Sequence, residues 1–229
     1  MSKHLRKKSI RDESLEQTLK NTVELAGNWE IGKMRIYSYQ DGVTKLGPGT
    51  RFVLWTQGCP RCCNGCMTPD SQSLAGGREM SVADIVDLIL MSGRDGLTIS
   101  GGEPFIQAKE LCELISTVKA YKDVGVIIYT GYTYEELSSS EDAYQKLLLE
   151  LTDLLVDGPY IDELNDGKNL RGSSNQRVIA LTKRYIDNVG EYGSKKAEIE
   201  LFMKENRLIL VGVPDKKTLN RLKKIYKED

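Results

Sequence analysis

The stretch RFVLWTQGCPRCCNGCMTPD, residues 51–70, joins a short apolar run to a dense group of cysteines. The apolar run ends at Gln57-Gly58, and four of the chain's five cysteines follow between Cys59 and Cys66. Thiolates are soft ligands that bind zinc, copper(I) or iron–sulfur clusters. The spacing therefore predicts a strand followed by a metal- or cluster-binding loop.

Two ligand sets can be drawn through this loop. Cys59, Cys63 and Cys66 form a three-ligand set with Cys62 left over, which would leave one iron of a four-iron cluster open to a substrate or cofactor. All four cysteines would instead close a zinc site or an electron-carrying cluster. The side chains of adjacent residues diverge in an extended or turn backbone, which favours the three-ligand set. A disulfide framework is the third alternative, and the lack of a recognisable export signal argues against it.

A second motif, TISGGEPF at residues 98–105, follows a predicted strand. Glycines have no Cβ, so Gly101 and Gly102 would let the backbone approach a bound molecule closely. The structural alternative is a simple turn at the strand end, Gly-Gly followed by Glu-Pro.

Together, the cysteine loop and the GGE motif resemble the radical S-adenosylmethionine (SAM) superfamily, in which a CxxxCxxC loop follows the first barrel strand and a GGE motif follows the second. Three further segments are similar to the anaerobic ribonucleoside-triphosphate reductase activating proteins, which are glycyl radical enzyme activases with a 4Fe-4S single-cluster domain. The segments are YTGYTYEEL at 129–137, VDGPY at 156–160 and RGSSNQR at 171–177.

The resemblance implies two cofactors, a [4Fe–4S] cluster on Cys59, Cys63 and Cys66 and a SAM molecule chelated to the fourth iron. A flavodoxin- or ferredoxin-type protein would supply an electron, and SAM would be cleaved to methionine and a 5′-deoxyadenosyl radical. That radical would take a hydrogen from a glycine of a partner enzyme such as anaerobic ribonucleotide reductase. No catalytic residue is expected beyond the cluster and SAM site. The expected SAM contacts are Gly65, Cys66, Met67, Ser100, Gly101, Gly102, Glu103, Thr130 and Asp157.

Some of these residues have specific expected roles. Gly65 stands where many family members of the radical SAM type carry an aromatic residue, which leaves Met67 or a backbone group as the adenine contact that the resemblance implies. Glu103 would accept a hydrogen bond from the SAM ammonium group. Asp157 would bind ribose hydroxyls or a backbone amide of a bound peptide, or would only start a turn. Thr133 predicts a helix N-cap.

The polar run at 171–177 makes a poor core and a good recognition surface. The substrate- or partner-recognition candidates are Arg171, Ser173, Asn175, Gln176 and Arg177. Cys112, which lies in a predicted helix, is expected to be a small core residue.

Short apolar strands alternate with amphipathic helices, which predicts an α/β fold with a parallel sheet. The resemblance implies a partial (β/α)6 barrel of the radical SAM type, as a single domain over 31–229 with a helical N-terminal extension at 1–30. Function in such folds lies at the carboxyl ends of the strands. The expected strands are 34–39, 51–56, 96–100, 124–130 and 153–157, the expected helices are 81–91, 107–121 and about 134–150, and apolar runs at 178–181, 199–203 and 208–211 precede a basic helix at 215–227.

Composition excludes several function classes. The net charge of −1 gives no bulk attraction to nucleic acid or acidic membranes, and no apolar run approaches the length of a membrane span. The single histidine, His4, excludes His-based triads and His-rich metal sites. We expect a cytoplasmic protein with no nucleic-acid or membrane partner.

Two alternative functions stay open. A radical SAM enzyme of this kind could modify another peptide or a small molecule, because a barrel core says little about the substrate. A non-catalytic zinc- or iron–sulfur-binding module would use all four loop cysteines. Replacing Cys62 with serine separates the models, since only a four-ligand site would lose its metal.

Overall fold

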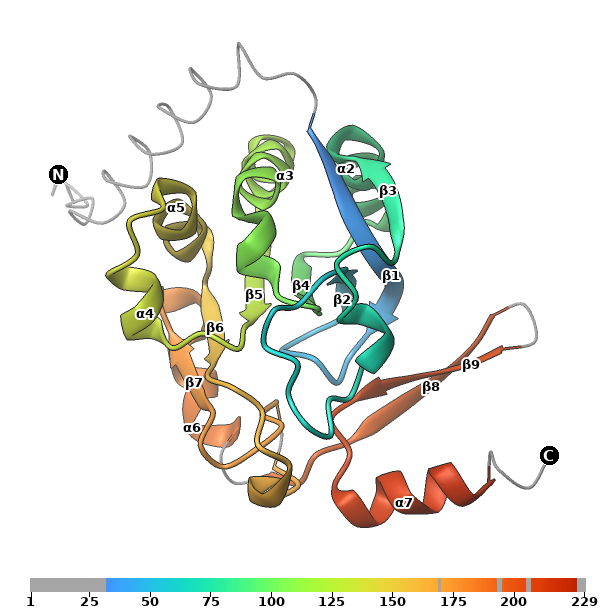
Figure 1. Ribbon diagram of the computed structural model, residues 1–229. Coiled ribbons are helices and arrows are strands. Elements are labelled where there is room, and N and C mark those ends of the chain that lie inside the picture. Colours follow the sequence, from blue (N-terminus) through green and yellow to red (C-terminus); the bar gives the residue numbers. More distant parts are fainter. Residues whose placement is uncertain (1–31, 169, 193–194, 205–206, 226–229) are drawn as a thin grey trace, which may run out of the picture.

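The computed structural model describes residues 32–168, 170–192, 195–204 and 207–225 (Figure 1). The helical extension predicted at 1–30 lies outside the described residues. A seven-stranded sheet forms the centre of the described part, and helices cover one of its faces. A C-terminal hairpin and short helical segments pack on the other face. None of the helices described here is long and apolar enough to cross a bilayer.

The predicted alternation of strands and helices is confirmed. The helix expected at about 134–150 is divided in two, because Ser139 ends the first helix and Asp142 caps the second by accepting a hydrogen bond from the N–H of Tyr144. In chain order the elements are β1 (Lys33–Val43), β2 (Arg51–Thr56), η1 (Pro69–Ser71), β3 (Arg78–Ser81), α2 (Val82–Ser92), β4 (Gly96–Gly101), η2 (Pro104–Gln107), α3 (Ala108–Tyr121), β5 (Gly125–Tyr129), α4 (Tyr134–Ser138), α5 (Ala143–Leu151), β6 (Leu154–Asp157), η3 (Asp162–Leu164), β7 (Arg177–Ala180), η4 (Lys183–Tyr185), α6 (Ile186–Tyr192), β8 (Ile199–Lys204), β9 (Arg207–Gly212) and α7 (Lys216–Ile225).

The strand order of the sheet is β3-β1-β2-β4-β5-β6-β7. Strands β2, β4, β5 and β6 are parallel neighbours, whereas β1, β3 and β7 pair antiparallel at the two sides. Strands β8 and β9 form a separate antiparallel pair. The α/β class and the parallel centre of the sheet are therefore confirmed. The expected six-stranded barrel is not confirmed, because only four neighbouring strands of the described sheet are parallel.

Strand β2 is buried on both faces, which explains the apolar run at 52–55 within it. Successive side chains of a strand point to opposite faces. Phe52 and Leu54 pack into the core beneath α2 and α3, whereas Val53 and Trp55 pack with Val211 of β9. The hairpin thus covers the face of the sheet that the helices leave open.

Arg51 closes the amino end of the sheet. It begins β2 and is 1% exposed. Its hydrogen bonds join β2, β4 and β5 to the segment that follows β7, at the edge opposite the cysteine loop. The guanidinium donates at 2.6–3.1 Å to Thr98 Oγ1, Tyr185 Oη and the carbonyl oxygens of Pro48, Leu97 and Gly125.

The carboxyl ends of the parallel strands meet at the other edge. The register pairs Thr56 with Gly101 and Tyr129 with Val156. The cysteine loop, the GGE turn and the loop after β5 therefore begin side by side, as expected for functional loops of a parallel sheet.

Candidate functional site

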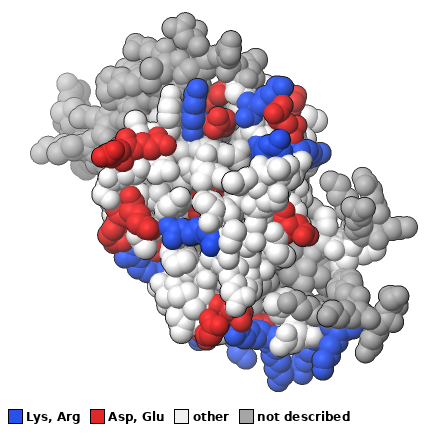
Figure 2. Space-filling model, in the orientation of Figure 1, with Lys and Arg blue, Asp and Glu red and all other residues white. Residues whose placement is uncertain are grey.

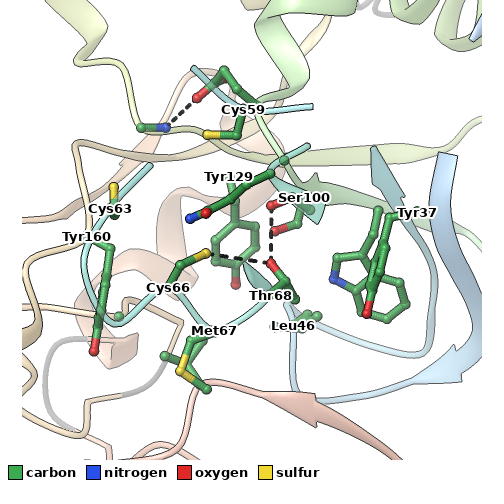
Figure 3. Close-up of a pocket in the computed structure, with 18 of the residues that line it drawn as sticks. Tyr37, Leu46, Cys59, Cys63, Cys66, Met67, Thr68, Ser100, Tyr129 and Tyr160 are labelled. Carbon is green, nitrogen blue, oxygen red and sulfur yellow. Dashed lines mark hydrogen bonds between the residues drawn. The ribbon is translucent and has the colours of Figure 1, made fainter. Parts of the chain in front are cut away.

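A cavity of about 710 Å³ lies at the carboxyl edge of the sheet (Figure 3). Its walls come from β1, the cysteine loop, the GGE turn, the end of β5, the loop after β6, and β9. Cavities of this size hold cofactor-sized ligands.

Three of the four loop cysteines line this cavity. Cys59, Cys63 and Cys66 are half-buried on its wall (Figure 3). Cys62 is exposed and is not among the residues that line the cavity. Cys62 has a φ of 45°, and its thiol donates to the carbonyl oxygen of Cys59. Cys62 thus lies outside the cavity that the other three cysteines line, which fits the three-ligand set.

The chemistry of the donors also fits an iron–sulfur cluster, because soft thiols gather on one wall. Burial raises the pKa of the Cys59 thiol, so metal binding would have to displace its proton. Within the described ranges, no three His, Cys, Asp or Glu side chains are grouped for a single metal ion. The assignment of Cys59, Cys63 and Cys66 as cluster ligands therefore stays a proposal.

The cysteine loop is closed at its base by hydrogen bonds to the segment around η1. The amide of Gln57 donates to the carbonyl oxygens of Asp70 and Ser73 at 3.1 and 2.7 Å. The backbone N–H groups of Gly58 and Cys59 donate to the residues just after Asp70 at 2.8 and 2.9 Å. The first cysteine is thereby held in place by the backbone on both sides of the loop.

Gly101 and Gly102 are required by the protein's own backbone. Gly101 has a φ of 101°, and a Cβ there would stand 2.5 Å from the backbone of Thr56. A Cβ on Gly102 would stand 2.1 Å from the carbonyl oxygen of Gly58. The two glycines thus let the GGE turn pack directly on the start of the cysteine loop. Their close approach to SAM remains a prediction.

Glu103 is 1% exposed and joins the ends of β4 and β5. Its carboxylate accepts hydrogen bonds from the Thr130 hydroxyl and the Gly131 N–H, both at 2.8 Å, and from the Phe105 N–H at 3.1 Å. Burial raises the pKa of Glu103, and these hydrogen bonds oppose the shift. Only part of its acceptor capacity is left for a SAM ammonium group.

Arg61 is a cavity residue that sequence reasoning missed. Its guanidinium lies 4.3 Å from the centroid of the Tyr132 ring and 3.2 Å from the Glu136 carboxylate. Glu136 also completes a capping box with Thr133 at the start of α4, which confirms the predicted N-cap. The loop between Cys59 and the next ligand is therefore attached to the segment after β5. The sequence signal that could have indicated Arg61 was its position between the cysteines of the loop.

Of the expected SAM contacts, Gly65 and Asp157 do not line the cavity, and the others do. Gly65 has a φ of 72°, and a Cβ there would meet the Asp162 side chain at 2.9 Å, so this glycine serves the turn. Asp157 accepts from the Tyr134 N–H at 2.7 Å and from the Arg177 guanidinium at 3.0 Å. The structure thus uses Asp157 to join β6, β7 and α4.

The polar run at 171–177 folds back on its own loop. The side chains of Ser173, Asn175 and Gln176 hydrogen-bond to the backbone of residues 158–161. The two arginines of the run form ion pairs with acidic side chains. Of the expected recognition residues, only Gln176 lines the cavity. The run therefore braces the loop after β6, and its role in recognition remains a prediction.

Sequence reasoning also missed the aromatic side chains that form part of the cavity wall. They are Tyr37, Trp55, Tyr129 and Tyr160. The Tyr129 hydroxyl is buried without a hydrogen-bond partner among the described residues, and burial raises its pKa.

Residues 208–213 of β9 and the following turn also line the cavity, and no local pattern connects them with the cysteine loop. Cys112 is fully buried, as predicted for a core residue.

Comparison with known proteins identifies the family of this chain. The family model of the 4Fe-4S single cluster domain matches residues 45–179. The chain is 38% identical over 147 residues to the anaerobic ribonucleoside-triphosphate reductase-activating protein of Vibrio cholerae, which covers 59% of this chain and 91% of that relative. The protein of the same name from Enterobacteria phage T4 is 32% identical over 142 residues, with 59% and 87% covered.

A relative with a different named target also matches. The pyruvate formate-lyase-activating enzyme of Listeria monocytogenes is 31% identical over 145 residues, which cover 60% of this chain and 56% of the relative. The family match spans the cysteine loop, the GGE turn and the loops after β5 and β6. The chain therefore belongs to the 4Fe-4S single cluster domain family, among the radical SAM activating enzymes whose cofactors are a [4Fe–4S] cluster and SAM.

Proposed function

We propose that this chain is a radical SAM activase that installs a glycyl radical on a partner enzyme such as anaerobic ribonucleotide reductase. The observation that carries the proposal is the position of Cys59, Cys63 and Cys66 on one cavity wall, with Cys62 outside it. The names of the relatives support the same reaction class. Two of them activate an anaerobic ribonucleoside-triphosphate reductase, and the third activates pyruvate formate-lyase.

The bound cofactors would supply a 5′-deoxyadenosyl radical, and the protein would position them. Cys59, Cys63 and Cys66 would hold the cluster. Glu103 would hold Thr130 and the following backbone in place beside the GGE turn, and would use its free acceptor capacity on the SAM ammonium group. The apolar wall of the cavity would exclude water from the reacting atoms.

The four parallel strands are, in this proposal, the centre of a partial (β/α)6 barrel within a single domain over 31–229. A flavodoxin- or ferredoxin-type protein would reduce the cluster in the cytoplasm. The net charge of −1 is consistent with the absence of a nucleic-acid partner.

An anaerobic assay tests the proposal. The protein is reconstituted with iron and sulfide, reduced, and mixed with SAM, and 5′-deoxyadenosine and methionine are measured by chromatography. Both products should form, and both should disappear in Cys59→Ala, Cys63→Ala and Cys66→Ala. Cys62→Ser is the matched control and should retain the cluster and the cleavage of SAM.

Three outcomes would contradict the proposal. Zinc without iron would end the radical interpretation. A stable [4Fe–4S] spectrum without any SAM cleavage would indicate a structural or electron-carrying cluster. Loss of the cluster in Cys62→Ser would favour the non-catalytic module that uses four cysteines.

A further inference from the structure

We propose that β9 is a docking edge, to which the glycine-bearing segment of the partner enzyme adds as an extended strand. This proposal rests on the proposed activase function and names the surface that receives the substrate. It concerns the C-terminal hairpin, residues 199–212, which lies beyond the family match at 45–179.

The edge of β9 faces the cavity. Residues 208–213 line it without a gap, and the cysteines line the same cavity. A strand that turned one face toward a cavity would contribute alternate residues, because its side chains alternate between faces. An unbroken series therefore indicates that the backbone edge lies along the cavity. Among the described strands, β9 pairs with β8 alone, so its second edge can accept another strand.

The outer face of the hairpin is apolar and exposed. Met203 pairs with Leu208 and Leu201 pairs with Leu210, so these side chains share one face. Leu201 is 52% exposed, Met203 is 74% exposed and Leu208 is 39% exposed. The opposite face packs into the core through Val211. Exposed apolar side chains in one patch indicate a surface for a partner.

The hairpin is already fixed in place. The Glu200 carboxylate accepts hydrogen bonds from the N–H and the hydroxyl of Thr44, at 2.8 and 2.7 Å, and Lys45 pairs with Glu198 at 2.6 Å. These contacts attach β8 to the turn between β1 and β2. An edge that is held rigid before binding costs less to order when a peptide adds to it.

The charge beside the hairpin indicates what kind of partner fits. Lys216, Lys217, Arg221 and Lys224 of α7 are exposed, and Figure 2 shows basic side chains gathered along the lower edge, where Figure 1 places α7. We therefore infer an extended segment with acidic flanking residues. A glycine at its centre would bring a backbone without a side chain to the inner end of the cavity.

The test uses the full, reconstituted chain and a synthetic peptide in which one central glycine is flanked by alternating valine and glutamate. In each of two further peptides, every second backbone amide is N-methylated. One peptide carries the methyl groups on the odd-numbered amides, and the other carries them on the even-numbered amides. In an added strand, only one set of N–H groups points toward β9. One methylated peptide should therefore bind at least about tenfold more weakly than the other, because several backbone hydrogen bonds are lost.

Two further measurements locate the binding. Hydrogen exchange of the amides of β9 should slow when the unmethylated peptide binds. Leu208→Lys should weaken binding, because Leu208 lies on β9 itself, whereas Met91→Lys should not, because Met91 is 85% exposed on α2, on the helical side of the sheet. Equal binding of both methylated peptides, absence of binding, or unchanged exchange in β9 would overturn the proposal.

The same samples separate this proposal from the proposed function. If the reduced protein cleaves SAM but the peptides fail the test, the docking edge is wrong and the activase function stands. If the peptides pass and SAM is never cleaved, the activase function is wrong although the edge binds extended peptides.

Discussion

Replacing Arg51 with methionine tests whether a buried cation holds the amino end of the sheet together. Arg51 is 1% exposed, and the guanidinium pairs with carbonyl and hydroxyl oxygens through five hydrogen bonds. The ring of Tyr185 also lies 5.6 Å from the guanidinium carbon. Methionine matches the aliphatic stem of arginine, ends near the position of Nε and has no donor, so the substitution removes the hydrogen bonds and keeps the volume of the stem filled.

The expected cost follows from the groups that lose their partner. The carbonyl oxygens of Leu97 and Gly125 each accept at 2.7 Å in the buried interior, and a buried acceptor without a donor costs about 1–3 kcal/mol. Thr98 keeps a hydrogen bond to the Leu46 carbonyl oxygen, so its loss is smaller. Removing a buried charge returns part of its desolvation cost. We therefore expect the free energy of unfolding to fall by about 3–5 kcal/mol, a large part of the 5–15 kcal/mol typical of a domain.

Urea denaturation followed by circular dichroism measures this change through the transition midpoint at a constant slope. Lys33→Met is the matched control, because Lys33 begins β1 but forms an exposed ion pair with Glu79, and its midpoint should stay nearly unchanged. The iron content of folded Arg51→Met should equal that of the wild type, since the cysteine loop lies at the opposite edge. A midpoint equal to that of the wild type would show that these hydrogen bonds do not outweigh the desolvation of the guanidinium.

Three more perturbations have defined outcomes. Glu103→Gln should lower the unfolding free energy by about 1–3 kcal/mol and weaken SAM binding in calorimetry, because its amide N–H2 cannot accept from every donor that the carboxylate satisfies. Gly102→Ala should lower the iron content after reconstitution, whereas Gly190→Ala, which has open space around it, should not. Arg177 lowers the pKa of Glu135 to about 2, so this pair stabilises the fold above the ordinary pKa of 4.5 and its contribution is lost as the pH falls toward 2. Glu135→Gln should flatten the dependence of the urea midpoint on pH over that interval.

The elements near the site were predictable where one local rule applied. The strand at 51–56 was evident from its apolar run at 52–55, because both faces of the strand are covered and apolar side chains fill them. The capping box at Thr133 was evident because capping uses hydrogen bonds within one turn. The helix expected at about 134–150 was wrong in its interior, because the cap at Asp142 starts a new helix within a pattern that looked continuous.

The sequence alone predicted the cysteine loop and its three-ligand spacing, because ligand chemistry and spacing are local properties of the chain. Only the tertiary structure decided that Asp157 pairs with Arg177 away from the cavity, and that Gly102 is needed against Gly58. It also brought β9 into the wall of a cavity that begins at the cysteine loop. These features join segments far apart in the chain, and their free energy comes from burial and hydrogen bonds that exist only when the sheet has formed.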